Sequence, residues 1–427
     1  MKRPVIGFAG LTHLGLVSAA AAAAKGFTVI AHGADAAAVA DIRAGNLPVA
    51  EPDLDGLFRD HAERLTVTSD LDELGRCDLV YIATDVPTDD EQRSDLTGIE
   101  ALIGRVIPAL AEHAVLVVLC QVPPGFTRGV PMAPERLVYQ VETLVFGRAV
   151  ERASRPERFI IGLADPAAPM PAALASYLGR FDCPVLPMRY ESAELAKIAI
   201  NCCLAASVSV ANTLAELSER VGADWAEVVP SLRLDRRIGP HSYLTPGLGL
   251  AGGNIERDLA TVLDLATRHG TEASTIRGFV TNSLHHQAWA WREFRQTHPE
   301  GGKLRVAVLG LAYKENTHST RNSAALSLIE RLRDLEVHAF DPVVPAAMAS
   351  GAVGARSAMA AAEGADVLFI MTPWPEFARL APMELARVMK GRTVIDPYRM
   401  LDGAAVVAAG LDHHARGLPP RRGLGHP

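Results

Sequence analysis

The first residues of the chain carry the pattern that most constrains its fold. An apolar run at 5–9 leads into a glycine turn, an alanine-rich segment up to Lys25 and a second apolar run at 27–31. Apolar runs of about five residues indicate buried strands, and the alanine-rich segment between them indicates a helix. Strand, turn, helix and strand in this order form the repeating unit of a parallel sheet covered by helices. We therefore expect an α/β fold.

The glycine turn matches two positions of a dinucleotide-binding fingerprint. In the pattern G-x-G-x-x-G the first glycine makes the turn, the second lets the backbone approach a pyrophosphate, and the third lets the helix pack on the strand. Thr12 stands at the second position, and Gly33 stands where an acidic residue usually binds the adenosine ribose. NAD is the expected cofactor, bound weakly; an empty or repurposed crevice is the alternative. The expected cofactor-binding residues of this region are Gly10, Thr12, Leu14, Gly15 and Asp35.

The remaining apolar runs predict a second domain of the same kind. Further strands are expected at 79–83, 115–119, 159–162, 304–311, 337–340, 367–371 and 393–396. The run at 304–311 ends in a glycine turn like the first one, as a repeated unit would. From 191 to 220 apolar residues recur at helical spacing, which predicts one long helix. The expected fold is two Rossmann-like doubly wound domains joined by a long central helix.

These elements divide the chain into four expected segments. The first is an N-terminal dinucleotide-binding domain at 1–188, and the second is a central helical domain at 189–300. A C-terminal Rossmann-like domain is expected at 301–412, and the family resemblance described below implies that it binds the substrate. The tail at 413–427 repeats Pro, Arg and Gly, so we expect it to be disordered.

The composition narrows the classes of partner. The formal net charge is -7 without clusters of Lys and Arg, so no nucleic-acid surface is expected. The apolar runs are shorter than the roughly 20 residues that cross a bilayer, and the first residues continue into a strand. We therefore expect a cytoplasmic protein without a membrane helix. The 5 cysteines have no metal-binding spacing, so neither disulfides nor a metal site are expected. Small molecules are the expected partners.

A glycine-rich run at 243–259, YLTPGLGLAGGNIERDL, has the composition of a site loop. It is too rich in glycine for a regular helix or strand, so its backbone amides are expected to lie close to a bound molecule. The pattern P-G-x-G-x-x-G-x-N-x-x-R-D resembles the active-site loop of the UDP-glucose/GDP-mannose dehydrogenase family, which reads P-G-x-G-F-G-G-S-C-x-P-K-D. Asn254 occupies the position of the catalytic cysteine of that family.

The resemblance extends from Val5 to about Leu401. Further matching motifs are D-V-P-T at 85–88, Q-V-P-P-G-F-T at 121–127, V-E-T-L-V-F-G at 141–147, A-E-L-A-K-I-A-I-N at 193–201, D-R-R-I-G at 235–239 and G-L-A-Y-K at 310–314. The catalytic residues that the resemblance implies are Glu142, Lys197, Asn201, Asn254 and Asp258. It adds Thr88 and Arg321 to the cofactor-binding residues, and it implies substrate binding by Arg237, Gly252, Arg257 and Lys314.

The chemistry differs from the family pattern at five positions, which are Thr12, Gly33, Gln121, Phe146 and Asn254. The family uses its cysteine thiolate to trap an aldehyde, so that two hydride transfers convert an alcohol into an acid. An amide is not nucleophilic enough for this step. The first hypothesis is an NAD(P)-dependent oxidoreductase that acts on the CH–OH group of a nucleotide sugar or related polar alcohol without that double oxidation. The second is a homologue without redox activity that binds a ligand or catalyses a non-redox step with Lys197, Asn201 and Asp258.

The resemblance also implies a substrate with a diphosphate or carboxylate group and a homodimer formed through the central helix. Lys197 and Asn201 lie one turn apart on that helix among apolar residues. An ammonium group in such surroundings is costly unless it meets an anion or an oxygen. We therefore expect Lys197, Asn201 and Asp258 to converge with the Asn254 loop on one pocket. We also expect Lys197→Met to abolish function without lowering the melting temperature.

Overall fold

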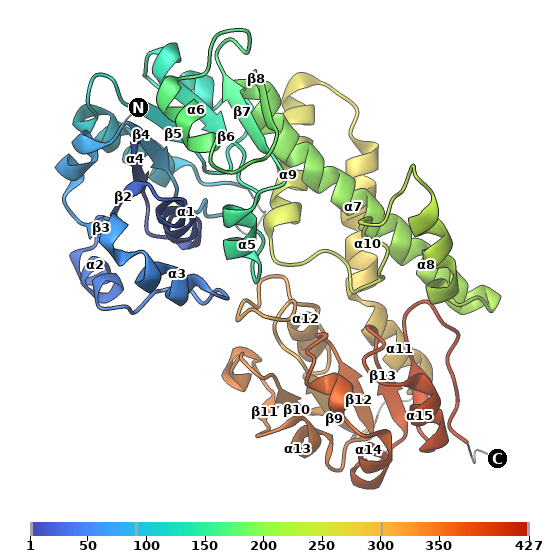
Figure 1. Ribbon diagram of the computed structural model, residues 1–427. Coiled ribbons are helices and arrows are strands. Elements are labelled where there is room, and N and C mark those ends of the chain that lie inside the picture. The colour runs from blue at the N-terminus through green and yellow to red at the C-terminus, as the bar shows by residue number, and fades with distance from the viewer. Residues whose placement is uncertain (1–2, 90–92, 300–301, 425–427) are drawn as a thin grey trace. The chain divides into compact units, whose positions relative to one another are not determined.

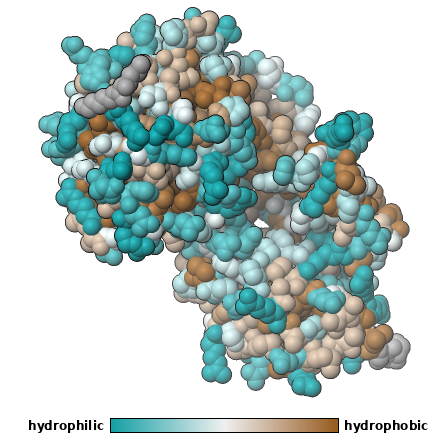
Figure 2. All heavy atoms as spheres, viewed as in Figure 1, coloured by the Kyte–Doolittle hydropathy of each residue, from teal (hydrophilic) through white to brown (hydrophobic). Residues whose placement is uncertain are grey.

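The computed structural model describes residues 3–89, 93–299 and 302–424, which divide between two units at residues 1–200 and 201–427. Each unit contains one sheet flanked by helices, so the expected α/β fold is confirmed (Figure 1). Polar residues cover most of the surface that Figure 2 shows, and apolar residues gather there in small groups.

The sheet of the first unit has the strand order β3-β2-β1-β4-β5-β6-β7-β8. Its strands are β1 (Val5–Ala9), β2 (Thr28–His32), β3 (Leu65–Thr68), β4 (Leu79–Ile82), β5 (Val115–Val118), β6 (Leu137–Gln140), β7 (Phe159–Leu163) and β8 (Val185–Arg189). Neighbouring strands are parallel except β6 and β7. The order of the first six strands is that of doubly wound dinucleotide-binding sheets, as expected.

Helix α1 (His13–Ala24) follows the glycine turn and packs through alanines. Ala19 to Ala23 are each at most 2% exposed, and such small side chains let the helix approach the sheet closely. A Cβ atom at Gly15 would lie 1.9 Å from the carbonyl oxygen of Gly10, so this approach requires glycine. The other helices of the unit are α2 (Ala36–Arg43), α3 (Leu54–Asp60), α4 (Thr97–Ala109), α5 (Ala149–Ser154) and α6 (Ala172–Leu178).

The expected long helix is present as α7 (Tyr190–Val221), which has 32 residues and passes from the first unit into the second. The helices that follow it are α8 (Trp225–Leu234), α9 (Asn254–His269), α10 (Ser274–Gln287) and α11 (Trp289–Thr297). The glycine-rich run follows α8, and its residues from Asn254 onward form the start of α9. The helix therefore begins at the position of the family's cysteine.

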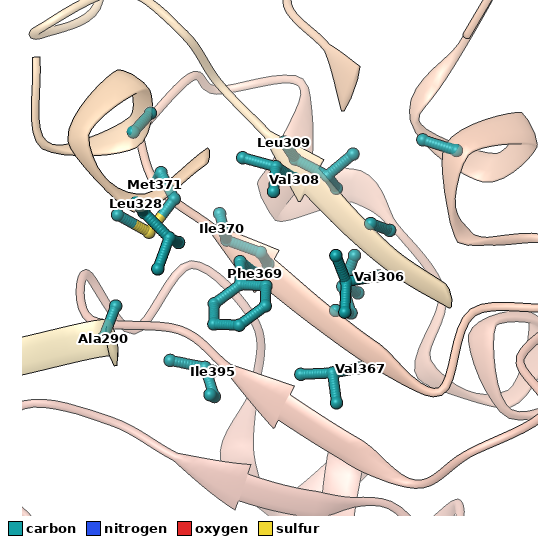
Figure 3. Packing of buried hydrophobic residues seen from close by; sticks show 14 of the residues in the cluster. Ala290, Val306, Val308, Leu309, Leu328, Val367, Phe369, Ile370, Met371 and Ile395 are labelled. Atoms are coloured by element: carbon teal, nitrogen blue, oxygen red, sulfur yellow. The ribbon is translucent and has the colours of Figure 1, made fainter. Parts of the chain in front are cut away.

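The sheet of the second unit is parallel, with the order β11-β10-β9-β12-β13-β14. Its strands are β9 (Arg305–Leu309), β10 (Glu336–Phe340), β11 (Val353–Gly354), β12 (Val367–Ile370), β13 (Thr393–Ile395) and β14 (Asp412–His414). Its helices are α12 (Ala324–Arg331), α13 (Ala358–Ala362), α14 (Pro382–Val388) and α15 (Gly403–Ala408). Figure 3 shows Phe369 of β12 packed among Val308, Ile395 and Ala290, so α11 closes this core.

Among the helices that the structure describes, α7 alone is long and apolar enough to cross a membrane by length and composition. Of its most apolar window, 39% is buried within the protein, and a long core helix passes the same test. Three polar side chains of α7, Glu194, Lys197 and Asn201, bind other groups of the protein. The absence of a membrane helix stays a prediction.

The tail differs from expectation. The composition predicts disorder from residue 413, but β14 pairs with β13 and Arg416 is fully buried. The prediction is therefore wrong for residues 413–424, and residues 425–427 lie outside the described residues. The prediction from composition failed because a segment rich in Pro, Arg and Gly is disordered only where its polar groups find no binding partners in the rest of the protein. Here the guanidinium of Arg416 lies 3.4 Å from the carboxylate of Glu219.

Candidate active site

The glycine turn has the backbone that its fingerprint describes. Gly10 has φ +125°, and a Cβ there would lie 2.5 Å from the carbonyl oxygen of Ala83, so only glycine fits. Thr12 has φ −86°, which suits any residue, and it stands at the N-cap of α1. Its hydroxyl donates to the carbonyl oxygen of Ala83 at 3.4 Å. The turn therefore forms without the middle glycine, with the threonine hydroxyl directed at β4.

The ribose end of the crevice is altered in two ways. A Cβ at Gly33 would lie 2.5 Å from Cδ1 of Leu11, so the leucine fills the space of a longer side chain. Asp35 caps α2, where its Oδ1 accepts the N–H groups of Ala37 and Ala38 at 2.9 and 3.3 Å. One carboxylate oxygen of Asp35 is therefore committed to the helix. Its role as a ribose ligand stays a prediction.

A buried pair at the start of α1 was not found from the sequence. Nε2 of His13 lies 3.0 Å from Oε2 of Glu51, and both side chains are less than 10% exposed. The other oxygen of Glu51 accepts the N–H of Ala149 at 2.7 Å. The ring of Phe146, which replaces a family carboxylate, lies 4.3 Å from the His13 ring between centroids. The only indication of this pair in the sequence was a histidine inside the fingerprint. It did not identify Glu51 as the partner.

Two of the expected catalytic residues meet in the first unit. Nζ of Lys197 lies 3.4 Å from Oε2 of Glu142, and the side chains are 13% and 18% exposed. Glu142 also accepts the N–H of Leu144 and lines a cavity of about 50 Å³ between α1 and the sheet, together with Leu14. An ammonium held beside a carboxylate is suited to stabilising negative charge on a nearby oxygen.

Glu194 fixes the loop that begins with Gln121, and sequence reasoning gave it no role. It is 0% exposed, and its two oxygens accept the N–H groups of Gly125 and Thr127 at 2.6 and 2.8 Å. Burial raises the pKa of Glu194, while these N–H donors oppose that change. The loop after β5 is thereby joined to α7. In the loop after β4, Thr88 forms an isolated antiparallel bridge with Ser94.

Two further catalytic candidates meet in the second unit. Nδ2 of Asn201 donates to Oδ2 of Asp258 at 2.5 Å, and both residues are buried. Nε of Arg257 lies 3.9 Å from the other oxygen of Asp258. Asn254 is exposed at the first position of α9, where the helix dipole would stabilise a thiolate if a cysteine stood there. An amide gains no nucleophilicity from that position.

Three of the cysteines are poorly suited to replace the missing nucleophile. Cys202 follows Asn201 on α7 and is partly buried. Burial and the charge of Asp258 raise the pKa of Cys202 to about 11, so it is a thiol at neutral pH. Burial also raises the pKa values of Cys77 and Cys120 to about 12. A thiolate nucleophile is therefore disfavoured at each of these three cysteines.

The glycine-rich loop is held by the protein through its own backbone. The N–H of Gly247 donates to Asn212 at 2.8 Å, and the N–H of Leu250 donates to Ser283 at 2.8 Å. The N–H of Gly252 donates to the carbonyl oxygen of Arg321 at 3.1 Å. These three N–H groups are therefore committed to the protein, and the expectation that the loop backbone lies close to a bound molecule stays a prediction. Glycine is needed because the loop packs closely: a Cβ at Gly252 would lie 2.6 Å from Tyr313.

The remaining predicted binding residues lie in two places. Arg321 packs against the loop, since a Cβ at Gly253 would lie 2.7 Å from its Nε. Nζ of Lys314 lies 5.7 Å from the ring centroid of Tyr313. Arg237 follows α8, has a side chain that is 88% exposed, and forms two hydrogen bonds to Asp235 at 3.0 and 2.6 Å. The structure thus brings Gly252, Arg321 and Tyr313 together, with Arg237 in a separate turn.

One group of side chains in the described part of the chain has the spacing of a metal site. Potential ligand atoms of Glu216, His285 and His286 lie within 4.8 Å of one another. Arg292 donates to Glu216 at 2.8 Å, and Nε2 of His285 lies 2.8 Å from the same carboxylate. Arg416 donates to Nδ1 of His286 at 3.1 Å. Guanidinium groups thus bind two of the potential ligand residues, Glu216 and His286. We therefore interpret the group as an ion-pair network.

The expected convergence is partly visible. Glu142 meets Lys197 in the first unit, and Asn201 meets Asp258 in the second. The meeting of Asn201 and Asp258 agrees with the expected convergence, and a pocket that also includes Lys197 and the Asn254 loop stays a prediction. The pairing of Glu142 with Lys197 was not expected, because spacing relates no residues that lie 55 positions apart.

Known proteins resemble the chain over its whole length. Models of the UDP-glucose/GDP-mannose dehydrogenase family match at 4–176 (NAD binding domain), 191–282 (central domain) and 307–403 (UDP binding domain). The UDP-glucose 6-dehydrogenase TuaD of Bacillus subtilis (strain 168) is 29% identical over 435 residues, which cover 97% of this chain and 93% of TuaD. The putative UDP-glucose 6-dehydrogenase YtcA of the same strain is 30% identical over 419 residues, covering 94% and 97%.

Solved structures give the same similarity of fold. A UDP-glucose dehydrogenase from Pyrobaculum islandicum superposes with a TM-score of 0.84 at 25% identity, covering 95% of this chain and 98% of that one. A UDP-D-ManNAc dehydrogenase from Pyrococcus horikoshii gives a TM-score of 0.82 at 23% identity, covering 97% and 99%. These matches include both Rossmann-like domains and the helices between them.

Proposed function

The chain belongs to the UDP-glucose/GDP-mannose dehydrogenase family, whose members are NAD-dependent, and we propose that it oxidises a nucleotide sugar only as far as the aldehyde. The observation that carries this proposal is Asn254 at the start of α9, beside the retained pair of Asn201 and Asp258. The residues that handle charge and protons remain, and the nucleophile for the second oxidation is missing.

The first unit retains the backbone that NAD needs. Gly10 and Gly15 stand where a Cβ would overlap the backbone, so the turn keeps the shape of a pyrophosphate site. Gly33 and the committed oxygen of Asp35 remove the usual ribose contact, so we propose weak binding. When bound, NAD accepts a hydride from the carbon that carries the hydroxyl group.

The side chains supply the rest of the chemistry in this proposal. The ammonium of Lys197 stabilises negative charge on the substrate oxygen as it develops. Asp258, held by Asn201, accepts the hydroxyl proton, and Glu142 is the other carboxylate that could do so. The alcohol thus loses one hydride and one proton and becomes an aldehyde. Oxidation to the acid would need a nucleophile that adds to the aldehyde, and Asn254 does not supply one.

A second candidate function is ligand binding or a non-redox step that uses Lys197, Asn201 and Asp258. The observation that favours it is the altered ribose end. Leu11 fills the space beside Gly33, and Asp35 caps α2. A crevice with both changes has lost a hydrogen bond that contributes roughly 1 to 3 kcal/mol.

Product stoichiometry tests the proposal. UDP-glucose, the substrate named for the relatives, serves as the probe, with NADH followed by absorbance and the aldehyde trapped with hydroxylamine. We expect one NADH for each sugar consumed and no UDP-glucuronate. Two NADH per sugar would contradict the proposal. If UDP-glucose binds in a calorimeter while NAD and NADP do not, the second candidate function replaces the first.

We also propose that two copies of the chain associate through α7. Val210, Leu214, Leu217 and Val221 recur on one face of this helix, and each is between 39% and 66% exposed. Such a row of exposed aliphatic side chains is typical of an interface between protein subunits. A second copy would cover the row by the symmetric contact that homodimers commonly use.

A further inference from the structure

The segment at 415–418, here named the C-terminal strap, lies beyond residue 403, where the match to the family models ends. It follows β14 and runs beside α8 (Figure 1). Ala415, Arg416 and Leu418 are at most 9% exposed, and Arg416 is 0% exposed. A fully buried guanidinium is costly unless several groups bind it, so its partners show what the strap does.

Arg416 binds the glycine-rich loop and α7 together. Its Nη1 donates to the carbonyl oxygen of Gly247 at 2.9 Å, and its Nη2 donates to the carbonyl oxygen of Asn212 at 3.0 Å. Nε lies 3.4 Å from Oε1 of Glu219, which balances the buried charge. The guanidinium also lies 5.4 Å from the ring centroid of Trp289. One side chain therefore joins three segments of the second unit.

Gly247 is held from both sides. Its carbonyl oxygen accepts from Arg416, and its N–H donates to the side chain of Asn212, the residue whose backbone oxygen Arg416 also binds. Both backbone polar groups of Gly247 are thus hydrogen-bonded, and their two partners, Arg416 and Asn212, are also hydrogen-bonded to each other. Gly247 stands seven positions before Asn254, so the set fixes the first half of the loop that leads to α9.

The strap has contacts of its own that keep Arg416 in place. The N–H of Gly417 donates to Glu219 at 2.9 Å, and the carbonyl oxygen of Gly417 accepts from the N–H of Trp225 at 2.8 Å. The indole of Trp225 donates to the carbonyl oxygen of Leu244 at 2.8 Å, just before the glycines of the loop. The strap, the start of α8 and the loop therefore form one hydrogen-bonded group.

We propose that Arg416 is a positioning residue, and that the strap holds the glycine-rich loop ready for its ligand. Preorganising a loop reduces the ordering cost of binding, so the strap raises ligand affinity without touching the ligand. The effect on affinity rests on the proposed function, since it requires a nucleotide-sugar substrate, whose binding the sequence resemblance assigns in part to Gly252 of this loop. The effect on the loop itself does not, and it can be measured without any ligand.

Hydrogen exchange tests the loop directly. In Arg416→Lys the charge beside Glu219 is kept, but one ammonium cannot reproduce the fork that binds Gly247 and Asn212. We expect the amides of 243–253 to exchange at least tenfold faster, a change of about 1.4 kcal/mol in opening free energy. Arg305→Lys, which alters a guanidinium beside Glu336 and His338, is the matched control and should leave the loop unchanged. A folded Arg416→Lys variant with wild-type exchange in the loop would overturn the proposal.

The unaltered protein gives a second test if the variant does not fold. In low denaturant, amides of 243–253 and of 411–418 should become exposed in one opening step. A loop that opens while the strap stays protected would overturn the proposal. Calorimetry with UDP adds the functional test, with affinity at least tenfold weaker in Arg416→Lys. If the wild type fails to bind UDP, the proposed function fails, and the exchange results still decide the role of Arg416.

Discussion

At the scale of one residue, the proposed single oxidation depends on Asn254. The residue stands at the N-terminus of α9, where a cysteine thiol would lose its proton readily. Asp258, four residues further along α9, is already hydrogen-bonded to Asn201. The structure therefore suggests that one substitution would supply the missing nucleophile.

We predict that Asn254→Cys gains the second oxidation. The thiolate would add to the aldehyde, and hydride loss from the adduct would give a thioester that water hydrolyses. The expected result is two NADH per sugar and formation of the acid, with Asn254→Ser as the control of similar size. If the Asn254→Cys variant still releases one NADH, although alkylation shows that its introduced thiol is reactive, another altered position blocks the step.

The pair of Lys197 and Glu142 changes an expectation drawn from the sequence. Without a visible partner, Lys197→Met was expected to leave the melting temperature level or higher. The structure shows a carboxylate 3.4 Å away that the variant would leave unpaired in a half-buried site. We now expect a loss of about 1 to 2 kcal/mol of stability, together with a loss of turnover of roughly a hundredfold or more.

A double variant separates these two effects. Glu142→Gln with Lys197→Met removes both charges and should recover the stability but not the turnover. Thermal unfolding and NADH formation measure the two quantities. A single Lys197→Met variant that melts lower but keeps full turnover would show that Lys197 is structural.

At the ribose end of the crevice, Leu11 decides whether an acidic residue can be restored. We predict that Gly33→Asp alone leaves NAD affinity unchanged, because its Cβ would meet Leu11 at 2.5 Å. Leu11→Ala with Gly33→Asp should tighten NAD binding by about tenfold to a hundredfold through the regained hydrogen bond. Calorimetry on both variants measures this. Equal affinities for the two variants would mean that the leucine is not the obstacle.

At the scale of elements, α10 contributes a titrating group to the interior of the second unit. Burial and the guanidinium of Arg416 lower the pKa of His286 from 6.5 to about 3, although the carboxylate of Glu216 acts in the opposite direction. The folded protein thus binds a proton at His286 less readily than the unfolded chain does. Stability is lost as the pH falls from 6.5 towards 3, by up to about 1.4 kcal/mol per pH unit.

We predict that His286→Gln flattens this dependence, because glutamine can accept from Arg416 without titrating. His285→Gln, on an exposed neighbour, is the control. All 4 tryptophans lie in the second unit, so tryptophan fluorescence during urea unfolding reports that unit alone. The comparison is made at pH 7, 6 and 5. Parallel pH profiles for wild type and His286→Gln would contradict the prediction.

The exposed row on α7 gives the second prediction at this scale. Leu217→Glu places a charge in the middle of the row, where Leu217 is 53% exposed. If two copies meet there, burial of that charge should shift the protein to monomers in light scattering. Leu284→Glu, on a 62% exposed leucine of α10, controls for the loss of an exposed leucine. A wild type that is already monomeric would contradict the dimer proposal.

At the scale of the whole molecule, local patterns were enough to predict the fold. Periodicity predicted the ends of β1, α1 and α7 within about a residue, because the spacing of apolar residues in each element shows which side is buried. The pairing of Glu142 with Lys197 was not predicted, since the two residues are 55 positions apart in the chain. The tail was mistaken for the same reason: its composition is polar, and the groups that bury Arg416 belong to other elements.

The C-terminal strap also bears on how the protein is made. A chain emerges from the ribosome from its N-terminus, and domains generally fold in that order during synthesis. The first unit can therefore assemble early, whereas the contacts of Arg416 with Gly247 and Asn212 can form only after all the strands and helices described for the second unit have been translated. In nascent chains stalled before residue 416, the glycine-rich loop would still lack its hydrogen bond to Arg416. The strap would thus delay the ordering of this loop until residue 416 has left the ribosome.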